Sequence, residues 1–194
     1  MNVAIKTERL PGSSYRIGVW VSLASMAMLF TSLSSAYIVR SASSFDWIPL
    51  RAPRVMFAGT ACILLSSVAL EFARRRLKES FHEAYARYLL LTALLGVAFL
   101  TSQLLAWRQL ARQGIYLASN PYNSFFYLLT AAHGVHSLGG LLALGFLWLR
   151  SRRQQSDDPD FVARRQARAD AVAIYWHFMD GLWIYLFLLL FLWR

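Results

Sequence analysis

The polar side chains most suited to chemistry lie in pairs within two apolar segments. His133 and His136 are three residues apart near the middle of residues 124–149, and His177 and Asp180 repeat that spacing in the last apolar segment. Side chains three residues apart share one face of a helix. Because an ionisable side chain is costly in hydrocarbon, such pairs mark a function or a buried contact. The pattern predicts two polar helix faces that contact other helices, lipid or another subunit.

Metal or haem binding is the first chemistry that these histidines suggest. His133 and His136 could chelate one ion, but a closed site needs three or four ligands. A haem ligated from two helices would take His136 and His177. At about 1.5 Å of rise per residue, these two lie about 10 Å apart in height on antiparallel helices, too far for the axial ligands of one flat haem. We therefore predict no metal and no cofactor in this chain.

Proton transport and nucleophilic catalysis have less support. Transporters commonly contain broken helices and repeated halves, whereas five apolar segments cannot form two equal halves and none of the five contains proline. The serines lie in no recognisable nucleophile motif, and no phosphate-binding glycine loop occurs. We predict no catalytic residue, and an independent transporter is the least favoured alternative.

The composition is typical of a membrane protein. Of 194 residues, 57% are hydrophobic and 15% are charged, which is more apolar than is usual for a soluble domain. The net charge is +10, but the basic residues cluster at the ends of apolar runs. That placement favours membrane anchoring over nucleic-acid binding. The single cysteine, Cys62, excludes an intrachain disulfide.

Five apolar segments are long enough to cross a bilayer, which takes about 20 residues. We expect an all-α bundle of five transmembrane helices at residues 17–39, 55–72, 86–107, 124–149 and 171–193. The bundle is one domain, residues 17–194, preceded by a cytoplasmic tail, residues 1–16. The connection from 150 to about 170 is expected to be a solvated loop. Glycines in the fourth segment predict close helix packing: Gly134, Gly139, Gly140 and Gly145.

The distribution of basic residues predicts the orientation. Fourteen of the Lys and Arg residues lie in the tail and in the connections after the second and fourth segments, and six lie on the opposite side. Cytoplasmic loops carry the excess of basic residues in membrane proteins. We therefore expect the N-terminus in the cytoplasm and the C-terminus outside.

Hydrogen bonds between helices are the structural interpretation of the polar pairs. We expect His133 and His136 to bond to neighbouring helices, and Asp180 to accept from a histidine or a tryptophan. Such bonds contribute about 1 kcal/mol or less each in a membrane. Tryptophans mostly near helix ends indicate interfacial belts: Trp107, Trp148, Trp176, Trp183 and Trp193. Arg150 follows the fourth segment and either anchors it or contacts a phospholipid phosphate, which matches a guanidinium.

Two motifs resemble a known family. The run FFYLLTAAHGVHSLGG, residues 125–140, resembles the Phe-Phe-x-Leu-Thr-Gly-x-His-Gly-x-His-Val-x-x-Gly signature of haem–copper oxidase subunit III. The run YWHFMDGLWIYLFLLLFLW, residues 175–193, is similar to that family's Tyr-Trp-His-Phe-Val-Asp-x-x-Trp ending. Weaker matches to the shorter, five-helix bacterial form lie in the first three segments: Trp20, Ser25, Phe30, Tyr37, Ser66, Ser67, Gly96, Gln103 and Trp107.

The resemblance implies a non-catalytic subunit of a respiratory oxidase in the bacterial plasma membrane. In this family, subunit III holds no redox metal, packs against the haem-bearing subunit I, binds phospholipid in a cleft, and supports proton uptake and oxygen reduction. Haem and copper then belong to partner subunits, which include subunit II. Carried over by position, the lipid contact is Arg150, and the residues that specify the bundle are His133, His136, Trp176, His177 and Asp180.

Two departures from the family pattern limit what the resemblance implies. Met26 and Ala106 stand where the family usually has glutamates, so any role of those carboxylates cannot be transferred. The family also includes a subunit associated with nitric oxide reductase. An accessory subunit of that enzyme and an assembly factor therefore stay open as alternatives, and the electron donor is left open as well.

Overall fold

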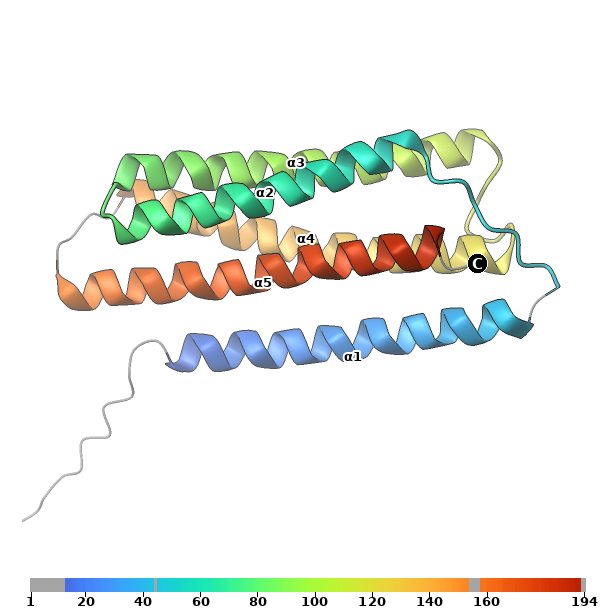
Figure 1. Cartoon of the computed structure of the whole chain (residues 1–194), viewed down its shortest axis with the longest axis horizontal. Coiled ribbons are helices and arrows are strands. Elements are labelled where there is room, and N and C mark those ends of the chain that lie inside the picture. Colours follow the sequence, from blue (N-terminus) through green and yellow to red (C-terminus); the bar gives the residue numbers. More distant parts are fainter. Residues whose placement is uncertain (1–12, 44, 154–157, 193–194) are drawn as a thin grey trace, which may run out of the picture.

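The fold is all-α, as the sequence predicts. A computed structural model describes residues 13–43, 45–153 and 158–192, and these ranges contain five helices and no strand. The helices are α1 (Ser13–Ser43), α2 (Arg54–Lys78), α3 (His82–Arg112), α4 (Pro121–Arg153) and α5 (Pro159–Phe191) (Figure 1). All five are long and apolar enough to cross a membrane, which confirms the five predicted segments.

The helices extend beyond the predicted apolar segments, most of all at the start of α5. The prediction of a solvated loop from 150 to about 170 is wrong, because α4 continues to Arg153 and α5 begins at Pro159. The side chain of Asp158 accepts from the amide of Asp160 at 3.4 Å and caps α5. Proline suits the first turn of a helix, where its missing N–H is not needed. Polar residues therefore continue the helix past the apolar run. The predicted end at Trp193 and most of the tail, residues 1–12, lie outside the described residues.

Four of the helices form a closed ring and the fifth lies outside it. The neighbours in the ring are α2 with α3, α3 with α4, α4 with α5, and α5 with α2, while α1 packs on α4 and α5 (Figure 1). Consecutive helices run in opposite directions. One end of the bundle therefore holds the α2–α3 turn, the start of α1, the end of α4 and the start of α5. We call it the α2–α3 end, and we call the other the α3–α4 end.

Aromatic side chains hold α1 against α4 at the α3–α4 end. The rings of Tyr37 and Trp47 have centroids 5.0 Å apart, and Tyr37 also meets Phe125 at 5.8 Å. Tyr122 lies beside Trp47 at 5.5 Å and donates to the carbonyl oxygen of Leu190 at 2.6 Å. Edge-to-face pairs at these separations are favourable. This aromatic cluster joins α1 and the connection that follows it to α4.

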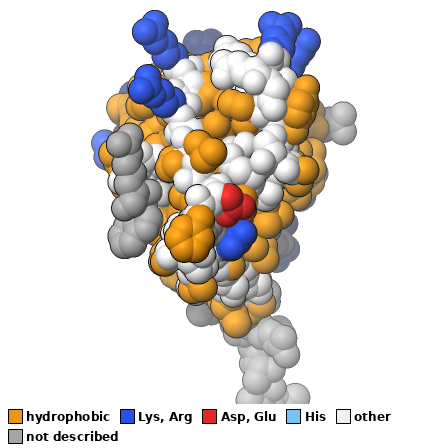
Figure 2. All heavy atoms as spheres, turned by 90° about the vertical axis from the view of Figure 1, so that its right-hand side faces the viewer, with side chains coloured by type: hydrophobic (Ala, Val, Ile, Leu, Met, Phe, Trp, Pro, Cys, Tyr) orange, Lys and Arg blue, Asp and Glu red, His pale blue; other side chains and the backbone are white. Residues whose placement is uncertain are grey.

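The surface is apolar, as expected of helices that face lipid. Large hydrophobic side chains are exposed along every helix, and Trp20 and Met28 of α1 are 61% and 71% exposed. Figure 2 looks onto the α3–α4 end, where hydrophobic side chains alternate with backbone, polar side chains and a few charged side chains. Single exposed apolar residues are ordinary in soluble proteins, whereas large apolar side chains exposed along every helix indicate a lipid or protein environment.

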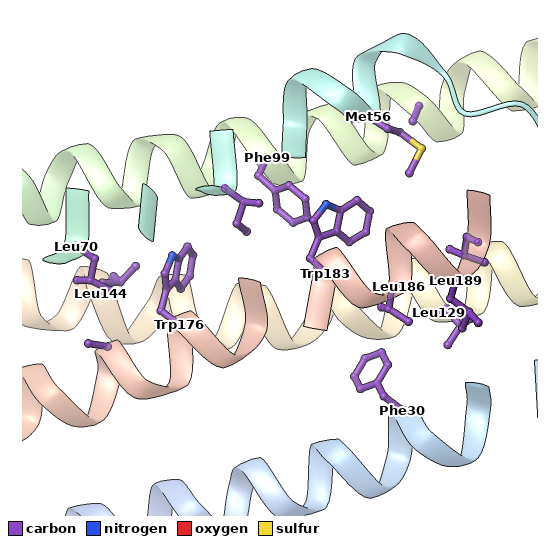
Figure 3. Packing of buried hydrophobic residues seen from close by; sticks show 14 of the residues in the cluster. Phe30, Met56, Leu70, Phe99, Leu129, Leu144, Trp176, Trp183, Leu186 and Leu189 are labelled. Atoms are coloured by element: carbon purple, nitrogen blue, oxygen red, sulfur yellow. The ribbon is translucent and has the colours of Figure 1, made fainter. Parts of the chain in front are cut away.

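Two tryptophans fill the centre of the ring. Trp176 and Trp183 project inward from α5 (Figure 3) and are 1% and 0% exposed. The prediction that these two belong to interfacial belts is therefore wrong. Their spacing of seven residues keeps both on the inner face of α5. The depth of a residue in the membrane does not show which face of the helix it occupies. A position near the end of a segment therefore could not tell whether a tryptophan faces lipid or the core.

Glycines on two facing helices make room for Trp176. A Cβ atom at Gly96 of α3 would lie 2.8 Å from the indole, and one at Gly140 of α4 would lie 2.9 Å from it. The predicted close packing at glycine is thus confirmed for Gly140. It is wrong for Gly145, where a Cβ atom would meet nothing within 4 Å. A glycine also permits close approach between α2 and α3, since a Cβ atom at Gly59 would lie 3.0 Å from Cβ of Ser102.

Candidate functional site

Polar contacts join α2 to α5 along much of the bundle, and we call this set the polar seam. Four hydrogen-bonding side chains of α2 contact five side chains of α5. They are Thr60, Ser66, Ser67 and Arg74 on α2, and Asp170, Trp176, His177, Asp180 and Trp183 on α5. In hydrocarbon no water satisfies such groups, so they must find partners within the protein. The seam therefore fixes which face of α2 meets α5.

The centre of the polar seam is formed by Ser67, His177 and Asp180. The Ser67 hydroxyl donates to the Asp180 carboxylate, and its oxygen lies 2.9 Å from His177 Nδ1. A hydroxyl has one hydrogen to donate, so His177 Nδ1–H donates to Ser67. The expectation that Asp180 accepts from a histidine or a tryptophan is wrong, since its donor is Ser67. Asp180 is 4% exposed, and its Oδ1 has no partner among the described residues.

Both buried indoles belong to the polar seam through their ring nitrogens. Trp176 Nε1 donates to Ser66 Oγ at 2.9 Å, and Trp183 Nε1 donates to Thr60 Oγ1 at 3.0 Å. The Trp183 ring also packs against Phe99 of α3 at 4.9 Å, and His133 of α4 lies beside the same ring at 5.2 Å. Each indole of α5 therefore touches all three of the other ring helices.

An ion cluster closes the polar seam at the α2–α3 end. Arg74 Nη2 lies 2.7 Å from Asp170 Oδ1, and Arg74 Nη1 lies 2.8 Å from Glu71 Oε2. The Arg74 side chain is 24% exposed and the two carboxylates are more exposed. Ion pairs of this exposure contribute about 1 kcal/mol or less. Their main effect is to set the register of α2 against the first turns of α5.

The two histidines of α4 turn in different directions. His133 is fully buried and its Nε2–H donates to the carbonyl oxygen of Met179 on α5 at 3.1 Å. His136 is half-buried and its Nδ1–H donates to the carbonyl oxygen of Ala132, in its own helix, at 2.7 Å. The expected bond from His136 to a neighbouring helix is therefore wrong. Its ring instead packs on Phe30 of α1, which is apolar, at 5.7 Å between centroids.

The histidines do not converge on a common ligand. His133 points to α5, His136 lies toward α1, and His177 bonds to α2. Within residues 13–43, 45–153 and 158–192, no group of three or more His, Cys, Asp or Glu side chains could hold a metal ion. His133 and His177 bond to other helices, whereas the His136 bond stays within α4.

The remaining positions singled out from the sequence lie outside the polar seam. Arg150 is half-buried near the end of α4, and its guanidinium lies 5.9 Å from the Phe146 ring centroid. Met26 of α1 lines a groove beside Gly140 and α5. Ala106 is fully buried in α3. The two positions where the family usually has glutamates are therefore not equivalent, since one faces a groove and the other lies in the core.

Sequence reasoning missed the α2 half of the polar seam and its ion cluster. Ser67 gave a signal, because paired serines at 66 and 67 occupy an otherwise apolar run. The ion cluster gave none, because Asp170 fell in the segment interpreted as a loop. Contacts between segments about 100 residues apart leave no periodic pattern in either segment.

Removal of the Ser67 hydroxyl is expected to destabilise the bundle. Ser67→Ala leaves the buried Asp180 carboxylate and His177 Nδ1–H without their partner, and an unsatisfied buried group costs about 1–3 kcal/mol. Unfolding in a denaturing detergent, followed by circular dichroism, measures the change. Ser25→Ala is the matched control, because Ser25 is exposed and, among the described residues, its hydroxyl bonds to the Val21 carbonyl of its own helix. Equal stabilities of the two variants would contradict the role of Ser67.

The fold and the polar seam define an all-α, multi-pass membrane protein in which buried polar side chains join helices. Comparison with known proteins identifies the group within that class. The family model for cytochrome c oxidase subunit III matches residues 11–194. The chain therefore belongs to the cytochrome c oxidase subunit III family, which confirms the resemblance of its two motifs.

Relatives from several bacterial groups agree with this assignment. The chain is 30% identical over 180 residues to cytochrome c oxidase subunit 3 of Thermostichus vulcanus, covering 91% of this chain and 86% of the relative. It is 29% identical over 175 residues to a probable cytochrome c oxidase subunit 3 of Nocardia farcinica, covering 88% and 84%. The chain is 25% identical over 195 residues to cytochrome c oxidase subunit 3 of a Bacillus species, covering 96% of this chain and 89% of the relative.

Proposed function

We propose that this chain is the non-catalytic subunit III of a haem–copper respiratory oxidase. It packs on subunit I, which carries the haem and copper, and it sustains proton uptake and oxygen reduction there. The observation that carries this proposal is the family match over residues 11–194. The polar seam supports it, because His177 and Asp180 bond to Ser67 and so hold α5 against α2. The chain then acts in the membrane as a packing partner of subunit I.

The proposed orientation places the α2–α3 end in the cytoplasm of a bacterium, with the C-terminus outside the plasma membrane. Fourteen basic residues belong to the N-terminal tail or to the parts of the helices at this end, as the positive-inside rule requires. Residues 17–194 then form one membrane domain. Proton uptake by an oxidase begins on the cytoplasmic side, so this orientation places the α2–α3 end on the same side of the membrane as that entrance.

Phospholipid binding at Arg150 is the second part of the proposal. Arg150 follows Leu149, the last residue of an apolar run, at the depth where headgroup phosphates lie. A guanidinium pairs with phosphate through two parallel hydrogen bonds. Lipid held at this point would lie at the end of α4 that faces the cytoplasm in this orientation.

Purification from native membranes tests the proposed function directly. An affinity-tagged chain is expected to bring down a haem-bearing subunit I and a copper-bearing subunit II in equal amounts, with oxygen-consuming activity. Mass spectrometry and reduced-minus-oxidised spectra identify the partners. Recovery with a nitric oxide reductase, or alone from membranes that contain an assembled oxidase, would contradict the proposal.

Substitution of His136 separates a packing role from a ligand role. His136→Leu removes the ring that contacts Phe30 of α1 and is expected to lower the yield of the assembled complex several-fold. The haem spectrum of the complex that does assemble should stay unchanged, because packing alone is altered. A shifted spectrum would show that His136 takes part in ligation and would contradict the proposal for this residue.

A further inference from the structure

A hydrogen bond joins the start of α3 to the start of α5 across the ring of helices. Arg165 Nη1, in the second turn of α5, donates to Nδ1 of His82, the first residue of α3, at 3.0 Å. The same guanidinium lies 5.1 Å from the ring centroid of Tyr85, one turn further along α3. Because α3 and α5 are not neighbours in the ring, these contacts connect opposite helices at the α2–α3 end.

The bond to Arg165 requires an uncharged His82. A guanidinium has donors and no acceptor, so His82 Nδ1 must offer a lone pair and carry no proton. A protonated imidazole has a hydrogen on both ring nitrogens and accepts no hydrogen bond. It would also bring a second positive charge against the guanidinium, and like charges repel most strongly at contact. The bond therefore exists only while His82 is neutral.

The Arg165 guanidinium has little else to bond with among the described residues. Its Nη2 is buried and makes no hydrogen bond to any of them. A cleft that Arg165 lines together with Arg150, Arg168 and four other residues has no aspartate or glutamate in its walls. A buried charged donor without an acceptor is costly. Loss of the bond to His82 therefore disfavours the half-buried position of Arg165 between α3 and α5.

The other charged groups at this end do not readily offset a proton on His82. Four carboxylates of α2, α3 and α5 are paired with other arginines: Glu79 with Arg76, Glu83 with Arg87, and Glu71 and Asp170 with Arg74. Asp158 and Asp160 lie at the N-terminus of α5, where their charge suits the helix dipole. The remaining groups lining the cavities beside His82 and Arg165 are basic: Arg150, Arg152 and Arg168. A paired carboxylate would have to leave its own arginine to neutralise His82.

We propose that His82 and Arg165 form a pH-sensitive latch, which holds α3 to α5 at the α2–α3 end and opens when His82 takes up a proton. Histidine is the side chain that most readily changes charge between pH 5 and 8. The folded bundle binds the neutral form, so the stabilisation is present at neutral pH and is lost as the pH falls. In the proposed orientation the latch faces the cytoplasm, and acidification there loosens this end. The latch does not depend on the proposed function, because both partners belong to this chain.

Thermal unfolding at two pH values tests the latch. The purified protein is unfolded at about pH 7.5 and at about pH 5.5, within the range in which histidine changes charge. His82→Gln keeps an acceptor for Arg165, the Oε1 atom, but takes up no proton. Between the two pH values, the melting temperature of the unmodified protein is expected to fall by about 3 °C more than that of His82→Gln, as the loss of one hydrogen bond to a charged group predicts. Groups that titrate in both proteins cancel in this difference.

Substitution of the arginine tests the other partner of the latch. Arg165→Gln is expected to abolish the extra loss of melting temperature at low pH. Arg164→Gln is the matched control and should keep that loss, because Arg164 is exposed beside Arg165 and carries the same charge. An equal fall in the unmodified protein and in His82→Gln would overturn the latch. Abolition of the extra loss by Arg164→Gln would attribute it to net charge, and would overturn the latch as well.

Amide hydrogen exchange at about pH 5.5 shows whether this end of the bundle opens. Exchange in residues 82–88 and 159–168 is expected to be faster in the unmodified protein than in His82→Gln, whereas exchange in α1 should be equal. Equal exchange in the starts of α3 and α5 would overturn the opening. If His82→Gln does not accumulate, the comparison of Arg165→Gln with Arg164→Gln by the same two measurements decides between the latch and an effect of net charge.

Discussion

Gly140→Val is expected to prevent stable folding of the bundle. A Cβ atom at position 140 would lie 2.9 Å from Trp176 and 3.1 Å from Tyr175, and valine adds two methyl groups beyond it. Trp176 has little room to move, because α3 also approaches the indole closely at Gly96, where a Cβ atom would lie 2.8 Å from it. Overpacking in a core of this density costs about 1–3 kcal/mol or more. The measurement is the amount of folded protein extracted from membranes and its melting temperature.

Gly145→Val is the matched control for this substitution. Gly145 lies in the same helix, and an added Cβ atom there would meet nothing within 4 Å. The two variants change helix propensity and hydrophobicity equally, so any difference between them reports the contact with Trp176. A Gly140→Val protein as stable and abundant as Gly145→Val would show that the indole is not confined.

The number and approximate places of the helices could be predicted because hydropathy is a local property. Each helix must satisfy its own backbone in the membrane, so an apolar run of sufficient length is strong evidence by itself. The ends were predicted less well. The first three turns of α5 are charged, and a charged segment such as residues 159–170 has the composition of a loop. The Asp158 cap, followed by Pro159, was the signal for an earlier start.

The candidate site could be predicted only in part, because its partners come from distant segments. The spacing of His177 and Asp180 correctly placed both on one face of a helix. It did not show which other helix that face meets. That helix is α2, through Ser67, and the choice depends on the order of helices around the ring. Trp176 and Trp183 show the same limit. A tryptophan in an apolar run suits a membrane interface or a packed core, and only the neighbouring glycines and hydroxyls decide which.

Loss of either buried indole is expected to destabilise the protein more than any single polar substitution in the polar seam. Trp176→Ala and Trp183→Ala each remove a side chain that contacts three other helices, and large-to-small changes of this kind cost about 3–5 kcal/mol. Trp176→Phe keeps most of the ring packing but loses the bond to Ser66 Oγ, so a loss nearer 1 kcal/mol is expected. Unfolding in denaturing detergent measures all three variants on one scale.

The double variant shows whether the two indoles act separately. Seven residues of helix separate Trp176 from Trp183 by about 10 Å, a distance at which the effects of two substitutions usually add within about 0.5 kcal/mol. They share no hydrogen-bond partner, since one donates to Ser66 and the other to Thr60. The free-energy changes of the two alanine variants should therefore sum to that of the double variant. A double variant as stable as either single variant would contradict this. It would mean that the ring of helices opens as one unit once either indole is lost.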